Sequence, residues 1–264
     1  KSAKVAQPAF YRCNIERMLN LIAKIAEEGS LSDSRAQGIS EAKDERGFSE
    51  FRRFLPTGER AMQEGEPWQL TEQGAALASA IREVDPERIA DGLANVPSVR
   101  LLFDRIAAAE IARPIDLELP SRAETTYRTL AEVCLLAAPI PGEGYYATTA
   151  KPPLREFADL ALERFRELES GDGLVSVGAW LEALVKRDGI HPERSRRNLD
   201  EAQASGMINR STEGSTTDTR HDQHAVHVLR RGTGAVRVDL IHLYRGDFLI
   251  ANKSSSSLRL GAVQ

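Results

Sequence analysis

The stretch that decides the fold is LVSVGAWLEALVKRDGIHPERSRRNLDEAQASGMINR, residues 174–210. Apolar residues recur at helical spacing on both sides of Gly189, and Trp180 shares a face with Leu184. Pro192 suits the first turn of a helix and Gly206 suits a C-terminal cap. The stretch therefore predicts two consecutive helices joined by a short turn, with Trp180 in the core.

The segments around this stretch complete a block of helices and strands. Residues 153–170 have the apolar spacing of a further helix. Residues 207–231 alternate on both sides of a Gly/Ser/Thr-rich tip, which predicts the two strands of a long wing. Residues 234–251 predict a terminal hairpin, and the Ser-rich remainder predicts a mobile tail.

Two earlier blocks repeat this order of helices and turn-rich strands. The first opens with a helix capped by Asn14 and stopped by Gly29, and it closes with WQLTEQGAAL, residues 68–77, where Thr71 caps a second helix. The second block places a helix at 121–137, with Ser121 and Glu124 as a capping box, before a hairpin at 139–149.

These motifs resemble the winged-helix superfamily. WQLTEQGAAL resembles the junction between wing and helix, and residues 174–210 resemble the helix, turn and recognition helix of bacterial winged-helix regulators. The resemblance implies a mainly α fold with small β-hairpins (α+β), built as tandem winged-helix modules. We expect modules at 1–84, 85–150 and 151–251, the last with a long wing and terminal hairpin, and a flexible tail at 252–264.

Composition limits the classes of protein that the chain can belong to. With 264 residues and 41% hydrophobic residues, it is long enough for two domains with buried cores. The net charge of −4 argues against coating of nucleic acid through overall charge, so any such contact must be regional. The two cysteines predict neither a disulfide framework nor a zinc site. Without an apolar membrane span or signal peptide, we expect a cytoplasmic, nucleoid-associated protein.

The arginines of residues 186–197 are the main candidates for a binding site. Five basic side chains there stand against two acidic ones. In a helix-turn-helix reader the second helix enters the major groove, where arginine pairs with guanine and asparagine with adenine. Arg194, Arg197 and Asn198 are predicted to meet the groove of double-stranded DNA. Predicted phosphate contacts are Arg187, Arg196, Arg210, Arg220, Arg230, Arg231 and Arg237.

A solvated surface helix is the alternative for the same cluster. Arg196 and Asp200 are four residues apart, as are Arg197 and Glu201, so pairing within the helix would occupy both arginines. The arginines of the first two blocks lie beside glutamates, so we expect them to contact DNA more weakly. These two blocks could equally be modules that bind a protein partner. These secondary candidates are Arg52, Arg53, Arg122 and Arg128.

Motifs for metal binding and catalysis are weak or absent. His221, His224 and His227 lie close together, but on a strand the last two point to opposite faces. The sequence contains no phosphate-binding loop, dinucleotide fingerprint or nucleophile elbow. We therefore expect no catalytic residue, metal or cofactor, although a hydrolase with unrecognised carboxylates stays a third possibility.

The prediction is a non-enzymatic protein that binds double-stranded DNA, as a transcriptional regulator or as a DNA-binding subunit of a larger complex. Three modules in one chain favour the complex. The alternative is a protein-interaction scaffold, as in condensin-like or anti-phage defence complexes, whose winged helices bind protein partners or a second copy of the chain. The net negative charge of the chain favours the scaffold, and the basic residues of the third block favour DNA binding.

Overall fold

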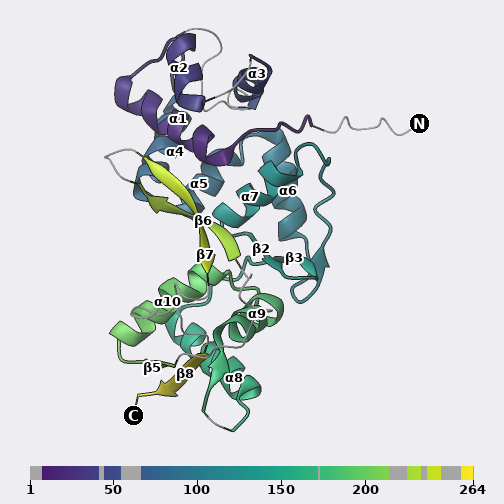
Figure 1. The fold of residues 1–264 in the computed structure, drawn as a ribbon, viewed down its shortest axis with the longest axis vertical. Helices are drawn as coiled ribbons and strands as arrows, with labels where there is room; N and C mark the ends of the chain where they lie inside the picture. Colours follow the sequence, from purple (N-terminus) through teal and green to yellow (C-terminus); the bar gives the residue numbers. More distant parts are fainter. Residues whose placement is uncertain are drawn as a thin grey trace, which may run out of the picture. The chain divides into compact units, whose positions relative to one another are not determined.

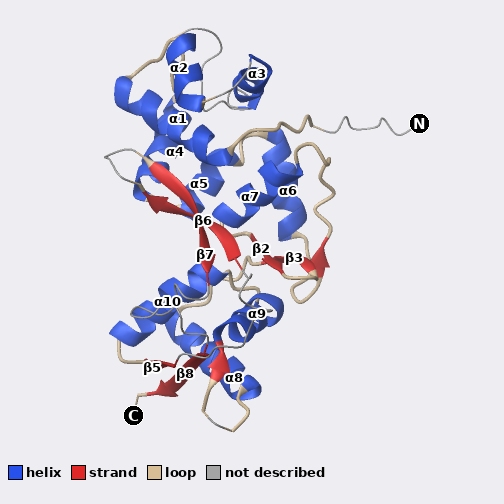
Figure 2. Ribbon diagram, viewed as in Figure 1, coloured by secondary structure: helices blue, strands red, loops and turns tan. Residues whose placement is uncertain are grey.

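A computed structural model of the chain describes residues 8–41, 45–54, 67–171, 173–213, 225–232, 237–244 and 257–263. The chain forms two compact units. The first comprises Lys1–Arg105, Leu117–Cys134 and Leu229–Ile241, and the second comprises Ile106–Asp116, Leu135–Val228 and His242–Gln264. Helices combine with small antiparallel sheets (Figures 1 and 2), which confirms the mixed α+β fold class. Within the described residues, no helix has the length and apolarity to cross a bilayer.

The first unit is mainly helical. Its helices are α1 (Ile15–Glu28), α2 (Asp33–Ser40), α3 (Glu45–Phe54), α4 (Glu72–Glu83), α5 (Pro86–Leu93), most of α6 (Pro97–Ala107) and α7 (Glu124–Val133). The predicted boundary between 84 and 85 falls inside this unit, where α4 packs against α5.

Local signals set several helix ends of this unit. Asn14 Oδ1 accepts a hydrogen bond from Arg17 N, and Gly29, at a φ of 80°, ends α1 as predicted. Thr71 Oγ1 caps α4 by accepting from Gly74 N. The capping box at Ser121 is wrong, because residues 121–123 form a turn and α7 begins at Glu124 without a side-chain cap.

The two cysteines lie in the core of the first unit and form no disulfide. Cys13 N donates to Thr126 Oγ1 at 3.1 Å, which ties the segment before α1 to α7. Burial, the main cause, raises the pKa of both the Cys13 and Cys134 thiols to about 12. Both side chains are therefore inert neutral thiols at physiological pH.

The second unit contains a three-helix group with an antiparallel sheet. Its helices are α8 (Leu154–Leu168), α9 (Val177–Asp188) and α10 (Pro192–Ala204), and the strands are β4 (Val175–Ser176), β5 (Ile208–Glu213) and β8 (Ser257–Ala262). The strand order is β4-β8-β5. Trp180 is fully buried, as predicted, and its Nε1 donates to Ala161 O at 3.1 Å. Gly189, at a φ of 63°, ends α9 as predicted.

A second small sheet in this unit contains the predicted hairpin. Strands β2 (Ala137–Ile140) and β3 (Gly144–Ala147) pair in antiparallel fashion, and β1 (Pro114–Ile115) pairs with the outer edge of β3. This hairpin and α7 were expected in one module, but they fall in different units.

The C-terminal segment corrects two predictions. The flexible tail at 252–264 is wrong for Ser257–Ala262, which form β8, the central strand between β4 and β5. Leu258 and Leu260 are buried while Arg259 is exposed, which is the two-residue alternation of a strand. The predicted pairing of the two wing strands is also wrong, because β5 pairs with β8 whereas β6 (Ala225–Arg231) pairs with β7 (Val238–Tyr244).

Leu258→Ala should lower the free energy of unfolding of the second unit by about 2–5 kcal/mol, since it leaves a cavity in the core. Arg259→Ala, on the opposite face of β8, should change it by no more than about 0.5 kcal/mol. Urea denaturation followed by circular dichroism measures both. Equal effects of the two substitutions would contradict the central position of β8.

Neither cysteine of the native protein should react with a thiol reagent at pH 8. With a pKa of about 12, each thiol is ionised in only about one molecule in ten thousand at that pH, and both side chains are buried. Both should react within seconds in denaturing urea. Rapid labelling of either thiol in the folded protein, read by mass spectrometry, would disprove this burial.

Candidate nucleic-acid interface on α10

The first turn of α10 is buried. His191 precedes the helix, and its Nδ1 accepts a hydrogen bond from Glu193 N at 3.1 Å. Pro192 occupies the first helical position, as predicted. All residues from His191 to Ser195 are buried. The turn that the sequence predicts to face a groove is therefore packed inside the protein.

Arg194 is a structural side chain rather than an exposed one. Only 8% of the residue is exposed, and its Nη1 donates to Thr148 O and Ala150 O, both at 3.1 Å. These carbonyls belong to the segment that leads from β3 to α8. The predicted position of Arg194 on the exposed face is corrected, because its guanidinium satisfies two backbone acceptors inside the unit.

Glu193 holds the next two arginines of the helix. The residue is 1% exposed, and it accepts hydrogen bonds from Arg196 Nε and Nη2, both at 3.1 Å, and from Arg197 Nε at 2.8 Å. A buried carboxylate needs compensation of this kind. The sequence suggested that Arg197 pairs with Glu201. Among the interactions of the described residues, it pairs with Glu193 instead.

Asp200 connects α10 to β5. It accepts from Arg196 Nη1 at 3.1 Å, which confirms the predicted pair four residues apart. It also pairs with Arg210 Nη2 at 2.7 Å. The side chain of Arg210 is only 4% exposed, so it links strand to helix instead of lining an outer wing surface.

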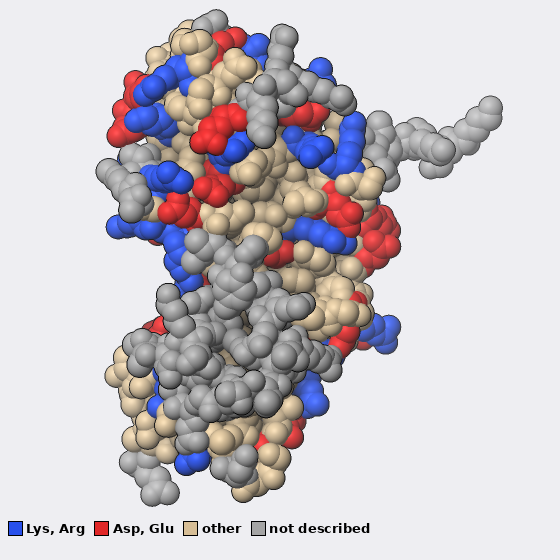
Figure 3. Space-filling model, viewed as in Figure 1, with Lys and Arg blue, Asp and Glu red and all other residues tan. Residues whose placement is uncertain are grey.

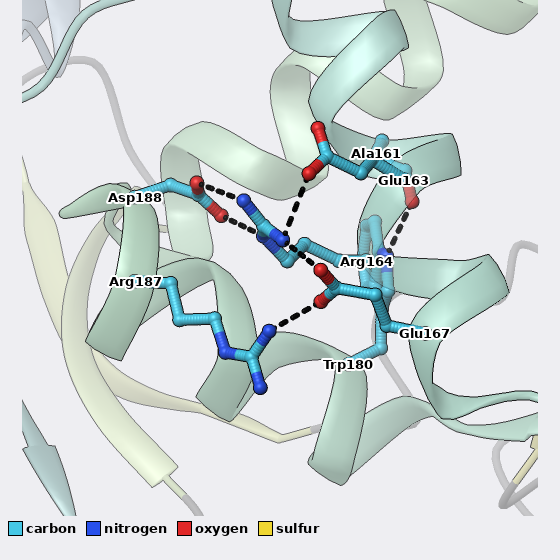
Figure 4. Close-up of polar contacts among 7 residues, drawn as sticks. All are labelled: Ala161, Glu163, Arg164, Glu167, Trp180, Arg187 and Asp188. Carbon is cyan, nitrogen blue, oxygen red and sulfur yellow. Dashed lines mark hydrogen bonds and ion pairs between the residues drawn. The ribbon is translucent and has the colours of Figure 1, made fainter.

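Arg187 lies at the surface beside a buried ion pair (Figure 4). Arg164 donates Nε and Nη2 to the two oxygens of Asp188, at 2.9 and 3.1 Å, and Nη1 to Glu167 at 2.6 Å. The hydrogen bond from Arg164 lowers the pKa of the Glu167 carboxyl below its usual value. Glu167 also accepts from Arg187, whose side chain stays 55% exposed. Exposed pairs of this kind are weak and open to exchange.

Of the groove residues predicted on α10, Arg197 and Asn198 remain at the surface. Arg197 keeps 43% of its side chain exposed despite the bond to Glu193, and Asn198 is half-buried. With Arg187 they form the exposed part of the predicted DNA site, which we call the α10 face. Of the predicted groove residues, the structure therefore leaves two at the surface and buries Arg194.

The predicted wing residues Arg230, Arg231 and Arg237 belong to the first unit. Arg230 donates to Leu229 O at 3.2 Å, Arg231 donates to Arg82 O at 3.4 Å, and Arg237 pairs with Asp239 at 2.9 Å. The contacts of Arg231 and Arg237 lie within the first unit. Arg220 lies outside the described residues.

The secondary candidates are engaged locally in the first unit. Arg52 pairs with Asp33 and lies over the rings of Phe48 and Trp68 at 5.5 and 5.9 Å. Arg53 is exposed. Arg122 donates to Phe10 O at 3.3 Å, and Arg128 pairs with Glu124.

The histidines predicted as weak metal candidates are only partly described. His221 and His224 lie outside the described residues, and His227 is half-buried on β6. In the described parts of the chain, no three His, Cys, Asp or Glu side chains are arranged to hold a metal ion.

Sequence reasoning predicted the partner Asp200 but missed Glu193, the buried carboxylate that holds Arg196 and Arg197. Glu193 precedes Arg196 and Arg197 by three and four residues, a spacing that brings side chains together on a helix. The sequence alone shows this spacing, but it does not show that Glu193 is buried. No protein-family model, curated protein or solved structure matches the chain.

Glu193→Gln should lower the free energy of unfolding by about 1–3 kcal/mol, because Arg196 and Arg197 lose a buried charged acceptor. Glu201→Gln, on the exposed surface of the same helix, removes the same charge and should have little effect. Urea denaturation measures both variants. If Glu201→Gln proved as costly as Glu193→Gln, the network at Glu193 would not stabilise α10.

Proposed function

We propose that the second unit binds double-stranded DNA through the α10 face. The observation that carries this proposal is the order of elements α8, β4, α9, α10, β5, β8, with β8 between the other two strands. A helix, a strand, two helices and two strands in this order are what we expect of a winged-helix domain from the sequence motifs. The second of the paired helices in such domains is the one that enters the major groove.

The proposed contacts are fewer than the sequence suggested. Arg197 and Asn198 meet base edges, and Arg187 holds a phosphate. Arg187 exchanges the partly exposed carboxylate of Glu167 for a phosphate, which costs little because the pair lies at the surface. Arg197 keeps its hydrogen bond from Nε to the buried Glu193 and contacts DNA through the exposed part of its side chain. Arg194, Arg196 and Arg210 are positioning residues that fix the helix on its unit.

This function is binding without catalysis. It suits a transcriptional regulator or the DNA-binding subunit of a larger complex, and the location that it implies is the cytoplasm, with the nucleoid.

A protein-interaction scaffold is the second candidate, and a specific observation favours it. Glu193 and Asp200 neutralise most of the basic charge of α10, and the chain as a whole carries a net charge of −4. A surface with so little net positive charge attracts phosphate weakly. In that case the modules would dock on protein partners.

Fluorescence anisotropy with random-sequence duplex DNA over a salt series tests the proposal. Arg187→Gln combined with Arg197→Gln should weaken binding about tenfold or more at low salt and reduce the slope of log K against log salt by about 1–2. The matched control is Arg155→Gln with Arg166→Gln, which removes two exposed arginines of α8.

The control should bind as the unmodified protein does. Identical affinities for the α10 pair and the control would remove the α10 face from the DNA site. A complete lack of binding by the unmodified protein at low salt would favour the scaffold.

A further inference from the structure

Residues 229–232 and 237–241, which we call the arm, contain the end of β6 and the start of β7 and belong to the first unit. One side chain of α1 holds the arm in place. Asn20 Nδ2 donates to Val238 O and Asn20 Oδ1 accepts from Val238 N, both at 2.9 Å. The amide therefore pairs with the backbone of β7 as a neighbouring strand would. Val238 itself is buried.

The docked arm places Arg231 at the end of α4. Arg231 Nη2 donates to Arg82 O at 3.4 Å, although the two residues are 149 positions apart in the chain. The C-terminal end of a helix attracts a cation, because its last carbonyls carry partial negative charge. This contact brings the exposed Arg231 to the exposed Arg82.

These two arginines differ from those of α10. In the part of the chain that the structure describes, neither Arg82 nor Arg231 has a carboxylate partner. Arg237, at the start of β7, is 61% exposed, with Asp239 at 2.9 Å and Glu16 at 3.9 Å. We call Arg82, Arg231 and Arg237 the arm patch. Figure 3 shows Lys and Arg atoms, in blue, together with Asp and Glu atoms, in red, near where Figure 1 draws the left-hand ends of β6 and β7.

We propose that the arm patch is a second site for the phosphate backbone of double-stranded DNA, and that it exists only while the arm is docked. Guanidinium groups make charge-assisted, often bidentate, hydrogen bonds to phosphate. Arg82 and Arg231 need not give up a carboxylate to do so. The site lies on the first unit and does not require the α10 face, although both bind the same class of ligand.

Two variants test this proposal by different means. Arg82→Gln with Arg231→Gln removes the two charges and leaves Asn20 in place. Asn20→Asp changes no arginine but replaces the donor to Val238 O with a second acceptor, which should release the arm. Hydrogen exchange at residues 238–241 reports whether the arm has left α1, and circular dichroism reports whether the unit remains folded.

The readout is the anisotropy of random-sequence duplex DNA over a salt series, with Arg155→Gln and Arg166→Gln together as the control. We expect the Arg82→Gln, Arg231→Gln variant to bind duplex DNA about tenfold more weakly at low salt. The slope of log K against log salt should fall by about 1.8, because each lost phosphate contact contributes about 0.9. Asn20→Asp should speed exchange in the arm and produce a similar loss of affinity, whereas the control should not.

Each other outcome decides against the proposal. If the Arg82→Gln, Arg231→Gln variant binds duplex DNA with the same affinity as the control variant, the arm patch is not a DNA site, whatever the α10 variants show. If Asn20→Asp releases the arm without loss of affinity, the docked arm does not assemble the site. If it fails to release the arm, Asn20 does not hold the arm in place. A loss in the arm variants without a loss in the α10 variants would uphold the arm patch and refute the α10 face. Absence of any duplex binding would refute both.

Discussion

The buried carboxylate of Glu193 is the constraint on which the surface of α10 depends. A charge that is 1% exposed must be compensated inside the protein, and Arg196 and Arg197 supply that compensation. Asp200 extends the network to Arg210, and Arg194 is held separately by two carbonyls. The main role of the basic cluster is therefore to stabilise the second unit. What remains for a ligand is the part of Arg197 that the network leaves exposed, together with Asn198 of the same helix and Arg187 of α9.

Much of the secondary structure followed from local signals. Asn14, Thr71 and Gly189 mark helix ends because a cap acts within a few residues of its own position. The strand β8 could not be predicted in this way. Its two buried leucines follow a run of serines, and only pairing with β4 and with β5, the latter about fifty residues earlier, makes the segment a strand. Composition alone indicated a tail.

The sequence also indicated the residue types of the candidate sites, but it did not indicate most of the groups that these side chains contact. The position of Arg194 depends on the carbonyl of Thr148, 46 residues away, and that of Arg231 on the carbonyl of Arg82, 149 residues away. Contacts at such separations follow from the tertiary fold. Glu193 was the exception, since helical spacing alone places it beside Arg196 and Arg197.

Two arginine surfaces are therefore proposed to bind DNA, the α10 face of the second unit and the arm patch of the first. Hydrogen exchange of the full chain, with and without saturating duplex DNA, tests their role most directly. We predict slower exchange in residues 197–204, 80–84 and 229–231, and unchanged exchange in α8. Protection confined to α8 or other segments, with neither arginine surface affected, would contradict the account.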